Sequence, residues 1–84
     1  MIYVKEQIVD DGTVSLDVSG VLDQGAVPVL EGVCERHLAN GKQVMVNLEA
    51  IVHITREGRA FIQGIRDRVR VANLPAFMAP EGNQ

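Results

Sequence analysis

The chain has 84 residues, 46% of them hydrophobic and 23% charged, with a formal net charge of −3. This length allows one domain with a modest core, and the apolar content is too high for a disordered chain. The negative balance argues against nucleic acid as the main partner, and no apolar run approaches the ~20 residues of a membrane-spanning helix. The N-terminus lacks the pattern of a signal peptide, and the single cysteine, Cys34, excludes an internal disulfide and suits a reducing compartment. We therefore expect a cytoplasmic protein.

The chain begins with the pattern of a β-hairpin. Apolar residues recur through 2–9 and alternate cleanly with polar residues through 13–21, which is typical of strands with one buried face. Asp10-Asp11-Gly12 lies between them and predicts a turn, because Asp tolerates a left-handed backbone and Gly adopts one without steric cost. An antiparallel pair is the expected result.

A first amphipathic helix of roughly four turns follows the hairpin. Asp23 is the expected N-cap, Pro28 fits only in the first turn, and Asn40-Gly41 is the expected left-handed end. The apolar stripe recurs at helical spacing and comprises Val27, Leu30, Val33, Cys34, His37 and Leu38.

The second half of the chain predicts a strand, a loop, a helix and a last strand. Residues 43–48 have the composition of a strand buried on both faces, and a loop over 49–55 is expected to follow. The second helix is predicted from Thr55, as its N-cap, to Asn73, and a short strand over residues 74–79. Its apolar stripe comprises Phe61, Ile62, Ile65, Val69 and Ala72.

The order β-β-α-β-α-β predicts an α/β fold with a mixed sheet, because strands joined through helices run parallel and the initial hairpin runs antiparallel. We expect a single domain over 1–79 and a flexible tail over 80–84. The segment between the central strand and the second helix is the expected functional centre, since ligands and partners bind at the carboxyl ends of parallel strands.

Charge is distributed unevenly along the chain. Residues 1–55 hold three Lys or Arg against eight Asp or Glu, whereas residues 56–72 hold five Arg against two acidic residues. Arg59, Gln63, Arg66 and Arg70 are spaced to line one exposed face of the predicted second helix. Two interpretations stay open: an ordinary solvated helix face, and a contact surface for an acidic partner.

Catalytic and metal-binding patterns are weak. Cys34 and His37 are three residues apart, but both fall on the buried stripe, where packing is the more common role. His53 and Glu49 supply too few ligands for a metal, and carboxylates such as Asp23 and Glu57 are more often helix caps. We expect no enzyme, no metal and no cofactor.

Two segments resemble the STAS domain, the family of bacterial anti-sigma-factor antagonists and of the cytoplasmic tails of sulfate transporters. Val18-Ser19-Gly20-Val21-Leu22-Asp23 is similar to the family's strand followed by G-x-L/I-D. Residues 46–58, VNLEAIVHITREG, resemble V-x-L-D/S-x-L/V-x-x-I/M-D-S-S-G. Order and spacing agree over about residues 1–79, which again implies the mixed α/β fold.

The resemblance implies a non-enzymatic partner-switching role in bacterial regulation. In the family the D-S-S-G segment docks onto a kinase of anti-sigma type, and phosphorylation of one serine breaks the contact by adding negative charge. Here Thr55 stands in place of the Asp, Arg56 and Glu57 stand in place of the serines, and Gly58 is retained. Constitutive binding, Thr55 as a substitute phosphoacceptor, and a structural or ligand-linked role are the alternatives.

These patterns lead to a predicted contact surface and a predicted assembly. The expected partner-binding residues are His53, Thr55, Arg56, Glu57, Gly58, Arg59 and Arg66. The partner is expected to be an anti-sigma or kinase-like protein; the alternative function is an accessory subunit that stabilises the cytoplasmic ATPase of a membrane transporter. Family members continue with a further helix, strand and helix, so this short form is expected to leave a sheet face and the edge near residues 76–79 open, and to form a homodimer or dock permanently.

Overall fold

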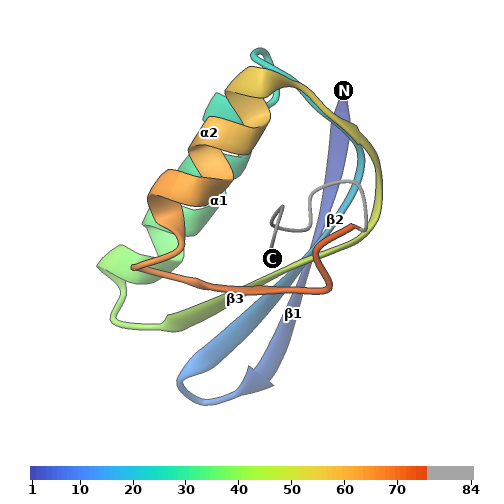
Figure 1. The fold of residues 1–84 in the computed structure, drawn as a ribbon. Coiled ribbons are helices and arrows are strands. Elements are labelled where there is room, and N and C mark those ends of the chain that lie inside the picture. The colour runs from blue at the N-terminus through green and yellow to red at the C-terminus, as the bar shows by residue number, and fades with distance from the viewer. Residues whose placement is uncertain (76–84) are drawn as a thin grey trace, which may run out of the picture.

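The structure, a computed structural model, describes residues 1–75. It contains one four-stranded sheet with strand order β1-β2-β3-β4, and two helices (Figure 1). β1 and β2 pair antiparallel, whereas β2–β3 and β3–β4 pair parallel. The predicted order β-β-α-β-α-β and the mixed sheet are therefore confirmed. The elements are β1 (Ile2–Asp10), β2 (Thr13–Leu22), α1 (Val27–Ala39), β3 (Gln43–Ile54), α2 (Arg56–Ile65) and β4 (Arg70–Ala72).

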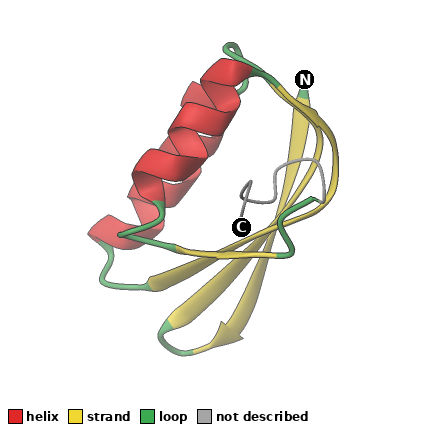
Figure 2. Ribbon diagram, in the orientation of Figure 1, coloured by secondary structure: helices red, strands yellow, loops and turns green. Residues whose placement is uncertain are grey.

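Both helices lie against the same face of the sheet (Figure 2). The core forms between them and the two central strands, because alternate side chains of β2 and β3 point to that face. The fully buried large side chains are Leu16, Val18, Leu22, Leu30, Cys34, Val46, Leu48 and Ile62. Packing is thus the role of Cys34, as its place on the apolar stripe predicts.

The prediction that the central strand is buried on both faces is wrong. Val44, Val46 and Leu48 are buried, but Met45 and Asn47 between them are only half-buried. The reason is that both described helices cover the same side of the sheet. On the other side Asn47 Nδ2 donates to Asp17 Oδ1 at 3.1 Å, so polar pairs replace apolar packing there.

The predicted loop over 49–55 is also wrong, since β3 continues to Ile54. Residues 19–22 of β2 pair with residues 50–54 of β3, with one register shift just before this segment and a second between Gly20 and Val21. Each shift places one extra residue in β3, which disrupts the alternation of buried and exposed side chains. That interruption is why the segment has the sequence pattern of a loop.

Helix α2 is shorter than predicted. It ends at Ile65, and the chain turns through residues 66–69 into β4, where Val71 lies opposite Val46. The expected helix end at Asn73 is therefore wrong, and so is a strand beginning at Leu74; residues 76–79 of that strand lie outside the described residues.

Helix α1 begins after the predicted cap. Its N-cap is Ala26, while Asp23 Oδ1 accepts the Ala26 N–H at 2.9 Å and closes the turn that precedes the helix. Pro28 lies in the first turn as predicted, and Gly41 has the left-handed backbone expected after the helix, with φ of 76°.

Candidate partner-docking surface

The start of α2 lies at the carboxyl ends of the two parallel central strands (Figure 1). Thr55 alone separates β3 from α2, and its N–H donates to the carbonyl of Leu22 at the end of β2, at 3.0 Å. Thr55 Oγ1 accepts the Gly58 N–H at 3.2 Å and lies 3.4 Å from the Leu22 carbonyl, to which it donates. The predicted N-cap is confirmed, and the cap holds the helix start on the sheet.

Gly58 occupies the point where α2 comes closest to β2. It is buried, and a Cβ on this residue would lie only 2.3 Å from the carbonyl oxygen of Leu22 and 3.1 Å from Ile54 Cγ2. Backbone atoms cannot move aside as a flexible side chain can, so only glycine fits this approach. This close contact accounts for the one residue of the D-S-S-G pattern that the chain keeps.

The remaining residues of the predicted surface are displayed to solvent. His53, Arg56, Glu57 and Arg59 are exposed, whereas Thr55 is half-buried and Gly58 buried. Within residues 1–75 the side chains of Arg56 and Arg59 make no ion pair or hydrogen bond. Glu57, in the first turn, complements the helix dipole. With Arg66, which is also exposed, the predicted set therefore divides into two residues that fix the helix and five that face outward.

The predicted basic face is only partly formed. Arg59, Gln63 and Arg66 are all exposed along α2, with Arg66 at its C-cap. Arg70 is separate from them because it lies in β4, opposite Met45. The face is therefore a row of three residues that starts near the cap.

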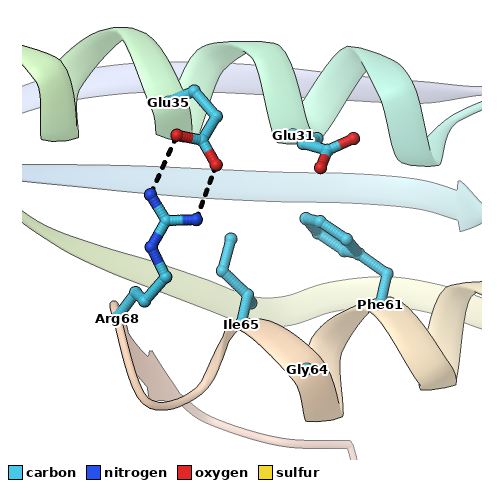
Figure 3. A pocket seen from close by; sticks show the side chains of 6 residues that line it. All are labelled: Glu31, Glu35, Phe61, Gly64, Ile65 and Arg68. Atoms are coloured by element: carbon cyan, nitrogen blue, oxygen red, sulfur yellow. Dashed lines mark hydrogen bonds and ion pairs between the residues drawn. The ribbon is translucent and has the colours of Figure 1, made fainter.

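Arg68 is one of the five arginines of residues 56–72, but among the described residues it is, unlike Arg56 and Arg59, paired with another side chain. Its guanidinium donates two hydrogen bonds to Glu35 of α1, at 2.7 and 2.9 Å (Figure 3). These bonds hold the pKa of Glu35 below its ordinary value of 4.5. The pair joins the chain just after α2 to the middle of α1.

A shallow hollow of about 240 Å³ lies between the two helices beside this pair (Figure 3). This hollow was not predicted from the sequence. The only local signal is that Glu31 and Glu35 on one helix, and Phe61 and Ile65 on the other, are each four residues apart, a spacing that places each pair on one face. The lining residues are Glu31, Glu35, Phe61, Gly64, Ile65 and Arg68.

The geometry offers little for catalysis. Cys34 is fully buried, and this burial, with Glu35 nearby, raises the pKa of its thiol to about 11. His37 Nε2 lies 2.6 Å from Glu6 Oε1, so the imidazole is held by a carboxylate. No group of three or more His, Cys, Asp or Glu residues within 1–75 is arranged to hold a metal ion. Neither α1 nor α2 is long and apolar enough to cross a membrane.

No family model and no curated relative matches the chain. Among solved structures, the anti-sigma factor antagonist SpoIIAA in its unphosphorylated form superposes with a TM-score of 0.70, at 16% identity over 90% of this chain and 77% of that one. An anti-sigma factor antagonist from Mycobacterium paratuberculosis gives 0.69, at 20% identity over 82% of this chain and 59% of that one. A Shewanella loihica protein with a SpoIIAA-like fold gives 0.62, at 10% identity over 90% and 69%.

These comparisons define the fold. The chain has the SpoIIAA-like, STAS-like fold, with a mixed four-stranded sheet and two helices on one face. The fold expected from the two sequence segments is thereby confirmed. Identities of 10–20% carry no more than the fold, so partner and role have to be argued from the site.

Proposed function

We propose that this chain is a non-enzymatic protein-binding module of bacterial regulation that docks its partner through the outward residues at the start of α2. The observation that carries the proposal is the contrast at this site: Thr55 and Gly58 fix the helix start, while Arg56, Glu57 and Arg59 project from it. Because the backbone at the helix start is fixed, binding has to order only the side chains, and these exposed charges favour a partner of complementary charge.

The charge of the surface indicates an acidic partner. Arg56, Arg59 and Arg66 leave three positive charges along α2, against Glu57 and Asp67. Because the arginines are exposed, they act mainly on association rate and on the choice of partner. An anti-sigma or kinase-like protein with an acidic groove would fit the role that the anti-sigma factor antagonists of the same fold suggest.

We further propose that docking is constitutive. Arg56 and Glu57 carry no hydroxyl group, and the Thr55 hydroxyl already accepts from Gly58 and donates to Leu22. A kinase would have to open this cap before it could reach Thr55, at a cost of about 1 kcal/mol. Thr55 as a phosphoacceptor stays a competing hypothesis, which intact-mass analysis of protein from its native cells tests directly.

The test is affinity capture from native cell extract with charge-matched variants. Wild type is compared with Arg56→Glu and Arg59→Glu, and the control is Arg70→Glu, an equal charge change on an exposed residue of β4. We expect wild type and the control to retain one specific protein and both α2 variants to lose it while staying folded. Mass spectrometry of the retained protein then separates a kinase-like partner from a transporter ATPase.

Two outcomes would refute the proposal. One is retention of the same partner by Arg56→Glu, Arg59→Glu and wild type alike, because the surface would then be an ordinary solvated helix face. The other is equal loss in the Arg70→Glu control, because net charge and not the α2 surface would then govern capture.

A further inference from the structure

Strand β1 forms one edge of the sheet, and no strand within residues 1–75 pairs with its outer side. It is nine residues long, and three of its apolar side chains are strongly exposed: Tyr3 by 70%, Ile8 by 83% and Val9 by 56%. Natural edge strands are commonly kept short, or protected by charges or bulges along their length. In β1 the one irregularity falls at its end, between Ile8 and Asp10.

The outward backbone groups of β1 can be assigned from its pairing with β2. The Val21 N–H donates to the Met1 carbonyl at 2.9 Å, and Ile2 lies opposite Gly20. In an antiparallel pair, residues that bond to the partner alternate with residues that do not. Val4, Glu6 and Ile8 therefore direct their N–H and C=O groups away from β2, where they need other partners.

Glu6, in the middle of this edge, has its carboxylate drawn back onto the protein. Its Oε1 accepts from Arg36 Nη2 at 2.5 Å and lies 2.6 Å from His37 Nε2, both on α1. The charge is thus neutralised and turned toward α1. Glu6 therefore does not protect the edge as a free charge would. Lys5, the other charged residue at the centre of β1, is exposed, but in an antiparallel pairing centred on Glu6 it would lie opposite Gln7 and not opposite another charge.

We infer that a second copy of this chain pairs with β1 in antiparallel register centred on Glu6, so that two four-stranded sheets join into one. In this register each Val4 lies opposite the other copy's Ile8, and each Tyr3 opposite the other copy's Val9. All four exposed or half-buried side chains gain an apolar neighbour. The outward N–H and C=O groups of Val4 pair with those of the other copy's Ile8, and those of Glu6 pair with the other copy's Glu6. Each of these backbone groups therefore has a hydrogen-bond partner.

The two neighbouring registers that keep the same backbone hydrogen bonding give less favourable side-chain pairs. A shift by two residues in one direction places Lys5 opposite itself and Val4 opposite Glu6. The opposite shift places Ile8 opposite Glu6 and Val4 opposite Asp10. The Glu6-centred register also places Ile2 opposite Asp10, near the strand ends. It alone pairs Val4 with Ile8 and Tyr3 with Val9, and the two carboxylates that it brings together are each paired with Arg36.

The assembly is compatible with the proposed docking surface. Helix α2 contacts β3 and α1, two strands away from the β1 edge. A two-fold axis normal to the sheet keeps all helices on one side, and both α2 surfaces stay accessible. The inference does not depend on the proposed function, and Arg59→Glu is expected to leave the dimer unchanged.

The experiment measures mass against concentration by sedimentation velocity, from micromolar to millimolar protein. Wild type is expected to approach twice its 9.2 kDa mass, and Ile8→Lys to raise the dimer dissociation constant about 10-fold or more, since symmetry removes two apolar cross-strand pairs. The matched control is Val52→Lys, which alters a residue that is 71% exposed on β3 and should leave the constant unchanged. A monomer throughout, or equal effects of the two variants, would overturn the inference.

The register is tested separately by cysteine cross-linking. Glu6→Cys places two thiols across the axis at a Cα separation of about 5.5 Å, within disulfide range, whereas Tyr3→Cys places them many residues apart. We expect oxidation to give a covalent dimer with Glu6→Cys and none with Tyr3→Cys; Cys34 is buried and stays out of the reaction. The reverse result, or equal yields, would refute pairing centred on Glu6.

Discussion

Replacing Gly58 with alanine tests most directly whether the start of α2 is held as the structure indicates. The added Cβ would lie 2.3 Å from the Leu22 carbonyl oxygen, about 1 Å inside normal contact, and 3.0 Å from Leu22 Cγ. The helix start would have to move outward. This movement would stretch the hydrogen bond from the Thr55 N–H to the same carbonyl, now 3.0 Å.

The magnitude follows from two costs and one gain. Overpacking in a well-packed site costs about 1–3 kcal/mol, and a buried backbone group that loses its partner costs about 1–3 kcal/mol. Against these costs, alanine is more favourable than glycine in a helix and raises the free energy of unfolding by about 1 kcal/mol. We therefore expect Gly58→Ala to lower the free energy of unfolding by about 3 kcal/mol, a large part of what so small a domain possesses.

The assay is urea unfolding followed by far-UV circular dichroism at fixed protein concentration, because the chain has no tryptophan. Gly64→Ala is the matched control, since a Cβ at Gly64 in the same helix meets nothing within 4 Å. This control should raise the free energy of unfolding by about 0.5–1 kcal/mol. If the Gly58 and Gly64 variants gain stability alike, the close approach of α2 to β2 is wrong.

Three further predictions concern single side chains. Thr55→Ala should lower the free energy of unfolding by about 1 kcal/mol, while Thr55→Asn, which keeps a capping oxygen, should change it by a few tenths; equal losses in urea unfolding would show that the cap is unimportant. The pKa of Glu35, measured by NMR titration, should lie below 4.5 and return toward 4.5 in Arg68→Ala. Because folding lowers this pKa, its stabilising effect is present above pH 4.5 and is lost as the pH falls through the folded-state value; an unchanged titration in Arg68→Ala would contradict the pairing. Cys34 should react with a disulfide reagent at neutral pH at least about 100-fold more slowly in native than in urea-unfolded protein, because the side chain is fully buried and the pKa of its thiol is raised to about 11; similar rates would show that this part of the core opens readily.

The sequence predicts most of the fold because local periodicity agrees with tertiary contacts over most elements. The hairpin alternates with a period of two, α1 carries an apolar stripe of helical spacing, and α2 begins at the Thr55 cap. Two of the misplaced boundaries, the end of β3 and the end of α2, have specific causes. Register shifts hide the second half of β3, and Ile65, Val69 and Ala72 keep helical spacing although the chain turns after Arg66.

The candidate site is predicted in residue identity but not in arrangement. The sequence picks out Thr55 as a cap, and the structure adds that the cap is also tied to Leu22, a residue 33 positions away. Such long-range contacts leave no periodic signal. The same applies to the β1 edge, whose exposure depends on which strands the sheet contains and cannot be inferred from alternation alone.

The close contact between Gly58 and Leu22 determines which residues at the start of α2 can be substituted during evolution. The residues that hold α2 to the sheet, Thr55 and Gly58, are constrained by the backbone of another strand. Arg56 and Glu57 between them touch solvent and can be exchanged at little energetic cost. Under the proposed docking role, substitution of these two exposed residues would change which partner binds while Thr55 and Gly58 keep the fold intact.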